Sequence, residues 1–124
     1  MPVLPAPATP THRLGGTAFT SLATPSRGTT DTSVWTVEIA PGTAGTVHRV
    51  TREEIFVVLG GHARVRLDGV DHEARPGDAV VVPPGVDFSI EPLGADVLRA
   101  LCALPVGGRA RVGTADAFTP PWAS

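Results

Sequence analysis

The chain has 124 residues, a formal net charge of −2 and a single cysteine, so it fits one domain without an internal disulfide. Hydrophobic residues make up 42% of the chain, while 14 glycines and 13 prolines favour short strands joined by tight turns. The small, dispersed charge excludes the basic surface that nucleic acid requires, and no apolar run reaches the roughly 20 residues that cross a bilayer.

The chain begins with a Pro-rich arm, residues 1–16, whose prolines are incompatible with a helix and with the apolar centre of a signal peptide. We expect this arm to be extended and to lie against the rest of the domain or a neighbouring subunit, and we expect the protein to be cytoplasmic. Residues 17–22 are predicted to form a first strand. Trp35, Val37 and Ile39 then alternate with polar residues, which is the period of a strand with one buried face.

The middle of the chain carries several further strand patterns. Residues 54–59 are apolar enough for a strand buried on both faces. Residues 63–67 alternate up to an Asp-Gly turn, which predicts a hairpin. Strands are also expected at residues 79–82 and 88–90. Residues 97–104 fit either a short helix by propensity or a strand by their length and bounding turns.

The spacing of the turns indicates the fold class. Short strands interrupted by Gly and Pro about every ten residues are typical of an all-β sandwich or closed barrel. We therefore predict one domain with an arm over residues 1–16, a barrel over residues 17–105 and a Gly/Pro-rich tail over residues 106–124. The tail contains Phe118 and Trp122, and we expect it to pack on the barrel as a lid or staple.

Two stretches of the chain have the spacing of a known pair of motifs. The first runs from Gly42 to Gly61 and reads GTAGTVHRVTREEIFVVLGG; the second runs from Gly77 to Pro92 and reads GDAVVVPPGVDFSIEP. Their glycine and proline frame matches the cupin motifs Gly-x5-His-x-His-x3-Glu-x6-Gly and Gly-x5-Pro-x-Gly-x2-His-x3-Asn. Over residues 34–105 the chain resembles the small single-domain cupins. This resemblance implies an all-β cupin jelly-roll barrel (a double-stranded β-helix) and, as is common among small cupins, a homodimer.

The resemblance also implies a degenerate set of metal ligands. In metal-binding cupins, the two His and the Glu of the first motif and the His of the second hold one metal ion. The matching positions here are His48, Val50, Glu54 and Phe88. A lone His-carboxylate pair holds first-row metals weakly. We therefore expect no cofactor, and the alternative is a divalent metal (Fe, Mn, Ni, Cu or Zn) held by His48 and Glu54 together with another group.

The motif positions are expected to face the barrel interior, because alternate strand residues share a face. In a dry cavity, His48 and Glu54 are candidate catalytic acid and base, or else a buried pair retained from a metal-binding ancestor. Cys102 shares a strand face with Ala100 and is either a third catalytic candidate, as a cavity thiol, or a small buried hydrophobe. The predicted ligand-binding lining consists of Trp35, Val37, Val50, Phe56, Phe88, Ile90 and Ala100.

Three functions stay open from the sequence. The first is a metal-independent isomerase, cyclase or lyase that transfers protons on a small, largely apolar organic molecule through His48 and Glu54. The second is a non-catalytic barrel that binds a small molecule or serves as an accessory protein. The third is a metal-dependent oxygenase or lyase with a remodelled site. The partner that we expect is a small-molecule ligand or substrate.

Overall fold

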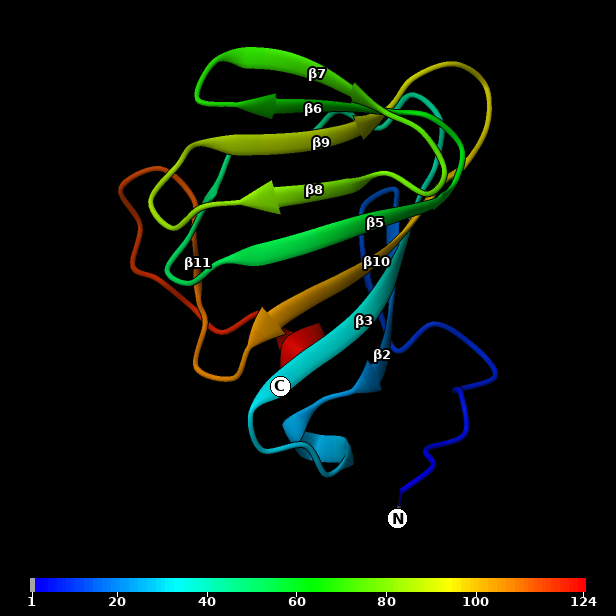
Figure 1. The fold of residues 1–124 in the computed structure, drawn as a ribbon, viewed down its shortest axis with the longest axis vertical. Helices are drawn as coiled ribbons and strands as arrows, with labels where there is room; N and C mark the ends of the chain where they lie inside the picture. Colours follow the sequence, from blue (N-terminus) through cyan, green and yellow to red (C-terminus); the bar gives the residue numbers. More distant parts are fainter. Residues whose placement is uncertain (1) are drawn as a thin grey trace.

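The structure of the protein is a computed structural model that describes residues 2–124. Apart from two short 3-10 helices, its regular secondary structure consists of antiparallel strands, which confirms the predicted all-β class (Figure 1). Its elements, in chain order, are β1 (His12–Leu14), β2 (Thr17–Ala23), the 3-10 helix η1 (Pro25–Arg27), β3 (Thr32–Ile39), β4 (Arg49–Val50), β5 (Glu54–Gly60), β6 (Ala63–Leu67), β7 (Val70–Ala74), β8 (Ala79–Val82), β9 (Phe88–Pro92), β10 (Leu98–Pro105), β11 (Ala110–Arg111) and the 3-10 helix η2 (Pro121–Ala123).

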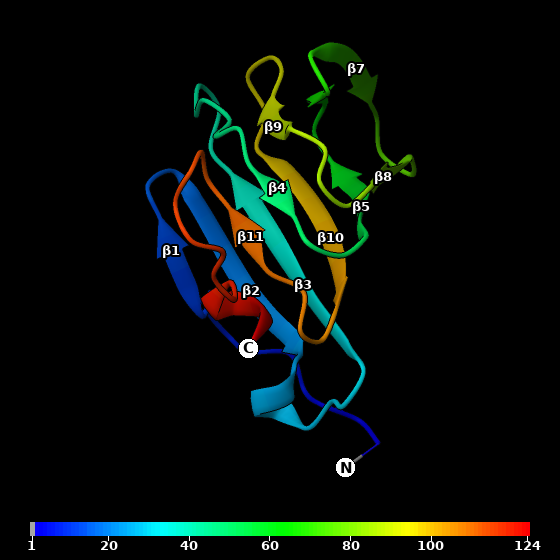
Figure 2. The same cartoon turned by 90° about the vertical axis from the view of Figure 1, so that its left-hand side faces the viewer.

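The strands form one large sheet and two small ones. The large sheet has the order β1-β2-β3-β10-β5-β8, and the others have the orders β7-β6-β9 and β11-β4. Figure 1 shows β7, β6 and β9 continuing the curve beyond β8, and Figure 2 shows β1 at the opposite end of the molecule. In the part of the chain that the structure describes, no helix is long and apolar enough to cross a membrane.

The core lies on the inner face of the large sheet. In β3 and β10 every second residue is buried, and the two strands pair so that Trp35 faces Cys102 and Val37 faces Ala100. Residues 98–105 form a strand rather than a helix, because β10 pairs with β3 on one side and with β5 on the other. Pairing with two neighbours therefore decides the conformation of a segment whose own propensity is ambiguous.

The strand β5 differs from its prediction. Its inner face carries the buried Glu54, Phe56 and Val58, whereas on its outer face Ile55 and Val57 are only half-buried and Leu59 is exposed. The prediction of burial on both faces is wrong, because no other element among residues 2–124 covers the outer face of this sheet. An apolar run in the sequence is equally compatible with a strand that is buried on only one face.

The N-terminal arm pairs with β2, and the C-terminal tail packs on β2 and β3. Residues 12–14, within the Pro-rich arm, pair with β2 as an additional short strand that the sequence pattern did not indicate. At the other end, the ring of Trp122 stacks on Phe19 with 3.7 Å between centroids. The Oγ atoms of Ser21 and Ser33 donate hydrogen bonds of 2.7 and 2.6 Å to the carbonyls of Trp122 and Ala123. These bonds hold the tail against the large sheet (Figure 2).

Candidate functional site

A cavity of about 420 Å³ opens inside the curve of the sheets. Its walls come from the inner faces of β2, β3 and β5, from the turn between β1 and β2, from residues 43–46, and from the tail between residues 110 and 122. Most of these side chains are apolar. His48 and Glu54 are the only titratable side chains among the lining residues, so they account for whatever acid-base chemistry the cavity offers.

The structure brings most of the predicted site residues together at this cavity. Those that line it are Trp35, Val37, His48, Val50, Glu54, Phe56 and Ile90.

Phe88, Ala100 and Cys102 do not line the cavity, against expectation. All three are almost fully buried, with at most 1% of their surface exposed. The ring of Phe88 lies between His48 and Phe56, at centroid distances of 4.0 and 5.8 Å. An inward-facing residue of a curved sheet can belong either to the cavity or to the solid core, and these three belong to the core.

The sequence pattern did not indicate several of the residues that line the cavity. Leu14 is the last residue of β1, Thr43 comes from the loop before His48, and Val112, Phe118 and Trp122 come from the tail. The tail carried a usable signal, because aromatic residues after a Gly-rich stretch suggest packing on the barrel. Irregular segments have no period, so their position relative to a cavity cannot be read from alternation.

Glu54 is a buried carboxyl group without a partner. It is the first residue of β5, where pairing with Val82 of β8 fixes its backbone. Only 5% of its surface is exposed, and its carboxyl group makes no hydrogen bond or ion pair within residues 2–124. Burial raises the pKa of Glu54 to about 8. At neutral pH this side chain is therefore largely a neutral acid that can donate a proton.

His48 is held by backbone and side-chain bonds. Its N–H and carbonyl exchange two 2.9 Å hydrogen bonds with Phe88 of β9. Its Nδ1 lies 2.8 Å from the carbonyl oxygen of Thr46. Since a carbonyl oxygen can only accept, Nδ1 carries the proton, and Nε2 of the neutral ring keeps a free lone pair. Burial lowers the pKa of His48, an effect that the bond to Thr46 partly offsets. The ring is thus a neutral base.

His48 and Glu54 are not bonded to each other in the part of the chain that the structure describes. No hydrogen bond or ion pair joins His48 to Glu54 in the described chain, so they do not form the buried pair that the sequence left open. Cys102 lies close enough to Glu54 for the charge of an ionised carboxylate to matter. Burial first, and then Glu54, raises the pKa of the Cys102 thiol well above its usual range. A thiol that stays protonated and fully buried is a poor nucleophile.

The donor set does not fit a divalent metal ion. Within residues 2–124, no three His, Cys, Asp or Glu side chains gather closely enough to hold one. Val50 lines the cavity at a position where the resemblance places an imidazole, and Phe88 fills another such position with a buried ring. Catalytic metal sites usually offer at least three protein ligands, so a metal-dependent step has no support from this geometry.

Comparison with known proteins identifies the family. The model of the cupin domain matches residues 35–104, which is more than half of the chain. The chain belongs to the cupin family. The jelly-roll prediction is thereby confirmed, together with the strand arrangement described above.

Solved cupin structures resemble this cupin at low sequence identity. KdgF from Halomonas sp. is 26% identical with a TM-score of 0.62, and the match covers 74% of this chain and 82% of KdgF. The polyketide cyclase RemF from Streptomyces resistomycificus is 22% identical with a TM-score of 0.68, over 82% of this chain and 73% of RemF. A structure from a study of the DMSP lyases RdDddP and RnDddQII is 23% identical with a TM-score of 0.70, over 79% and 53% of the two chains.

An uncharacterized protein of Methanocaldococcus jannaschii shares 36% identity with this cupin over 52 residues. The match spans 42% of each chain, so this cupin covers less than half of that relative. The family match and the solved structures together establish the fold.

Proposed function

We propose that this cupin binds a small, uncharged, largely apolar organic molecule in its cavity and moves protons on it without a metal, with Glu54 as the acid and His48 as the base. The observation that supports this most is the pair of unlinked titratable groups in an apolar cavity. Burial keeps the Glu54 carboxyl group protonated and the His48 ring unprotonated at neutral pH. Each group is thus ready for one half of a proton transfer.

The chemistry that suits this pair is enolisation. Neutral Glu54 can donate its proton to a carbonyl oxygen of the substrate, while Nε2 of His48 removes a proton from the adjacent carbon. An isomerisation, a cyclisation or an elimination can each begin with this step. A polyketide cyclase and DMSP lyases are named among the proteins with a similar fold, which is compatible with the proposal at the level of fold alone.

The lining also limits the charge of the ligand. Within residues 2–124, no Arg or Lys side chain lines the cavity. A carboxylate or phosphate group would therefore lose its water without gaining a cationic partner, which is strongly unfavourable. Aromatic side chains, among them Trp35, Phe56 and Phe118, offer flat apolar surface instead. We infer that the ligand is neutral and contains a ring or another extended apolar part.

A deuterium-exchange experiment tests the proposal without knowledge of the natural substrate. Enolisable bicyclic ketones such as 1-tetralone are incubated with the protein in D₂O, and mass spectrometry follows deuterium incorporation above the buffer background. Glu54→Gln and His48→Ala are each expected to lower the protein-dependent rate by about 100-fold or more. Glu53→Gln is the matched control, because Glu53 is the exposed neighbour of Glu54.

Non-catalytic binding is the second candidate, and the scarcity of polar groups in the cavity favours it. The same ketones and their carboxylate counterparts are then compared for their shift of the melting temperature. Stabilisation by the neutral compounds without exchange would support a binding protein. Stoichiometric Fe, Mn, Ni, Cu or Zn in the purified protein, lost in His48→Ala, would instead contradict the metal-independent proposal.

A further inference from the structure

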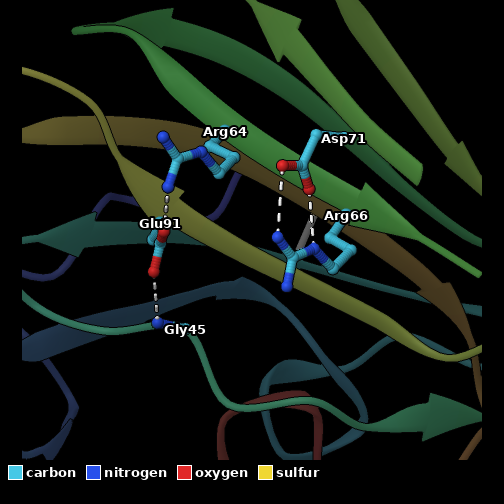
Figure 3. Close-up of polar contacts among 5 residues, drawn as sticks. All are labelled: Gly45, Arg64, Arg66, Asp71 and Glu91. Carbon is cyan, nitrogen blue, oxygen red and sulfur yellow. Dashed lines mark hydrogen bonds and ion pairs between the residues drawn. The ribbon is translucent and has the colours of Figure 1, made fainter. Parts of the chain in front are cut away.

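The loop before His48 is held from outside the cavity by a carboxylate. The backbone N–H of Gly45 donates a 2.9 Å hydrogen bond to Oε2 of Glu91 on β9. The other oxygen of Glu91 accepts a 3.1 Å hydrogen bond from Arg64 on β6, directly opposite in the strand register. Figure 3 shows this chain of contacts running from Arg64 through Glu91 to the loop. One carboxylate therefore links the small sheet to a wall of the cavity.

Gly45 lies directly on the backbone of β9. A Cβ atom at this position would lie 2.9 Å from the carbonyl oxygen of Ile90, closer than carbon and oxygen atoms pack. Only glycine lets the loop approach β9 so closely, and Glu91 grips the loop at this same point. The position of the Gly45 peptide is thus determined by steric contact on one side and by a charge-assisted hydrogen bond on the other.

The carbonyl of the residue that follows Gly45 holds the ring of His48. Thr46 follows Gly45 directly, and its carbonyl oxygen accepts the hydrogen bond from Nδ1 of His48 at 2.8 Å. A shift of the Gly45 N–H moves this carbonyl, since only one peptide unit lies between them. Glu91 does not line the cavity and touches no group that could react.

We propose that Glu91 is a positioning residue, which holds the Gly45 N–H so that the Thr46 carbonyl keeps His48 in its Nδ1–H tautomer, with Nε2 free as the proton acceptor. The role of Nε2 as a base rests on the proposed function, whereas the tautomer itself does not. Arg64 supports Glu91 by holding its second oxygen. The sequence pattern does not indicate this arrangement. Glu91 is simply one of the polar residues that alternate with apolar ones along its strand.

A second ion pair on the same sheet supplies a matched control. Arg66 donates two hydrogen bonds, of 2.6 and 3.1 Å, to Asp71 on β7. Figure 3 shows this pair beside the Arg64–Glu91 pair but without a contact to the loop. Removal of Asp71 therefore also breaks an arginine-carboxylate pair of this sheet, yet leaves the cavity wall untouched.

The tautomer is read directly by ¹⁵N nuclear magnetic resonance of the imidazole nitrogens. The signals of His48 are assigned by their loss in His48→Ala. In the unaltered protein we expect a protonated Nδ1 and an unprotonated Nε2, seen as widely separated ¹⁵N shifts. Glu91→Ala is expected to move the two shifts toward each other as the Nε2–H tautomer becomes populated. Asp71→Ala is expected to leave them unchanged.

Two results would overturn the proposal: an Nε2–H tautomer in the unaltered protein, or unchanged His48 shifts in a folded Glu91→Ala variant. If Glu91→Ala does not fold, Arg64→Ala decides, with a smaller shift in the same direction expected and no shift contradicting the proposal. Failure of the proposed function is recognised separately. In that case Glu54→Gln leaves ketone exchange unchanged, whatever tautomer His48 adopts.

Discussion

The buried environment of Glu54 disfavours the ionised form of its carboxyl group. The pKa of its carboxyl group rises from 4.5 to about 8 because burial disfavours the ionised form. The folded protein therefore binds this proton more tightly than the unfolded chain does. Between these two pH values the unfolded chain has lost the proton while the folded protein retains it, so ionisation of Glu54 favours unfolding as the pH rises.

Glu54→Gln removes this dependence. We expect the free energy of unfolding of the unaltered protein to fall by at most about 5 kcal/mol as the pH rises from 4.5 to about 8. The variant should lack that loss and be the more stable protein at pH 8 and above, with little difference at pH 4. Urea unfolding at a series of pH values measures the effect. Parallel pH curves for the two proteins would show that Glu54 is ionised in the folded state.

The titratable residues of the cavity could be predicted because motif spacing marks them. His48 and Glu54 both lie on the cavity, whereas Phe88 and Cys102, which share inward-facing positions, lie in the solid core. Alternation tells which face of a strand points inward but not how far the cavity extends. Glu91 could not be recognised at all, since its partner is a backbone N–H in an irregular loop.

The turn after β5 depends on a glycine, because the backbone of Val97 lies close to it. Gly61 has a φ of +78°, and a Cβ atom there would lie 2.5 Å from the carbonyl oxygen of Val97. Gly69, in the hairpin between β6 and β7, has a similar φ of +80° but open space around it. The two positions thus share a left-handed backbone conformation and differ in steric contact.

Gly61→Ala is expected to cost about 3 kcal/mol or more, because strain and overlap with the Val97 backbone act together. Gly69→Ala should cost only about 1 kcal/mol, from the left-handed conformation alone. Chemical denaturation of both variants gives the comparison. Equal losses would show that the chain near Val97 yields easily, so that steric contact is not what requires glycine at this turn.

The strands themselves were largely predictable, and the exceptions have identifiable causes. The alternation of β3 and the hairpin of β6 and β7 follow directly from the sequence pattern. The strand β1 has three residues, which is too few for a period to be recognised. The tail was expected to pack as a lid or staple. Which of its residues reach the cavity depends on hydrogen bonds from Ser21 and Ser33, and no local sequence pattern indicates these bonds.

The outer face of the large sheet is the surface on which we expect a partner subunit to bind. Its central strands present apolar side chains that are half-buried or exposed, and no element among residues 2–124 covers them. A contiguous apolar surface of this kind usually marks an interface, and two such faces can pack as layers. The side chains concerned are Val34, Ile55, Val57, Leu59, Val81 and Leu101.

We expect a homodimer that forms through this face. Leu101→Asp, in the middle of the face, should give a monomer of 12.8 kDa, whereas the unaltered protein should have twice that mass. Val70→Asp is the control, because Val70 is exposed on the other sheet, in β7. Light scattering after size-exclusion chromatography measures the masses. A monomeric unaltered protein, or a dimeric Leu101→Asp variant, would contradict this prediction.

The tail has a consequence for how this cupin could diversify. Residues 110–122 supply one wall of the cavity, yet they contribute only the two-residue strand β11 to the sheets. Substitutions at Val112 or Phe118 change the shape of the cavity without touching the pairing of the large sheet. Selection for a new ligand can therefore act on this segment while the scaffold, with Glu54 and His48 in place, stays constant.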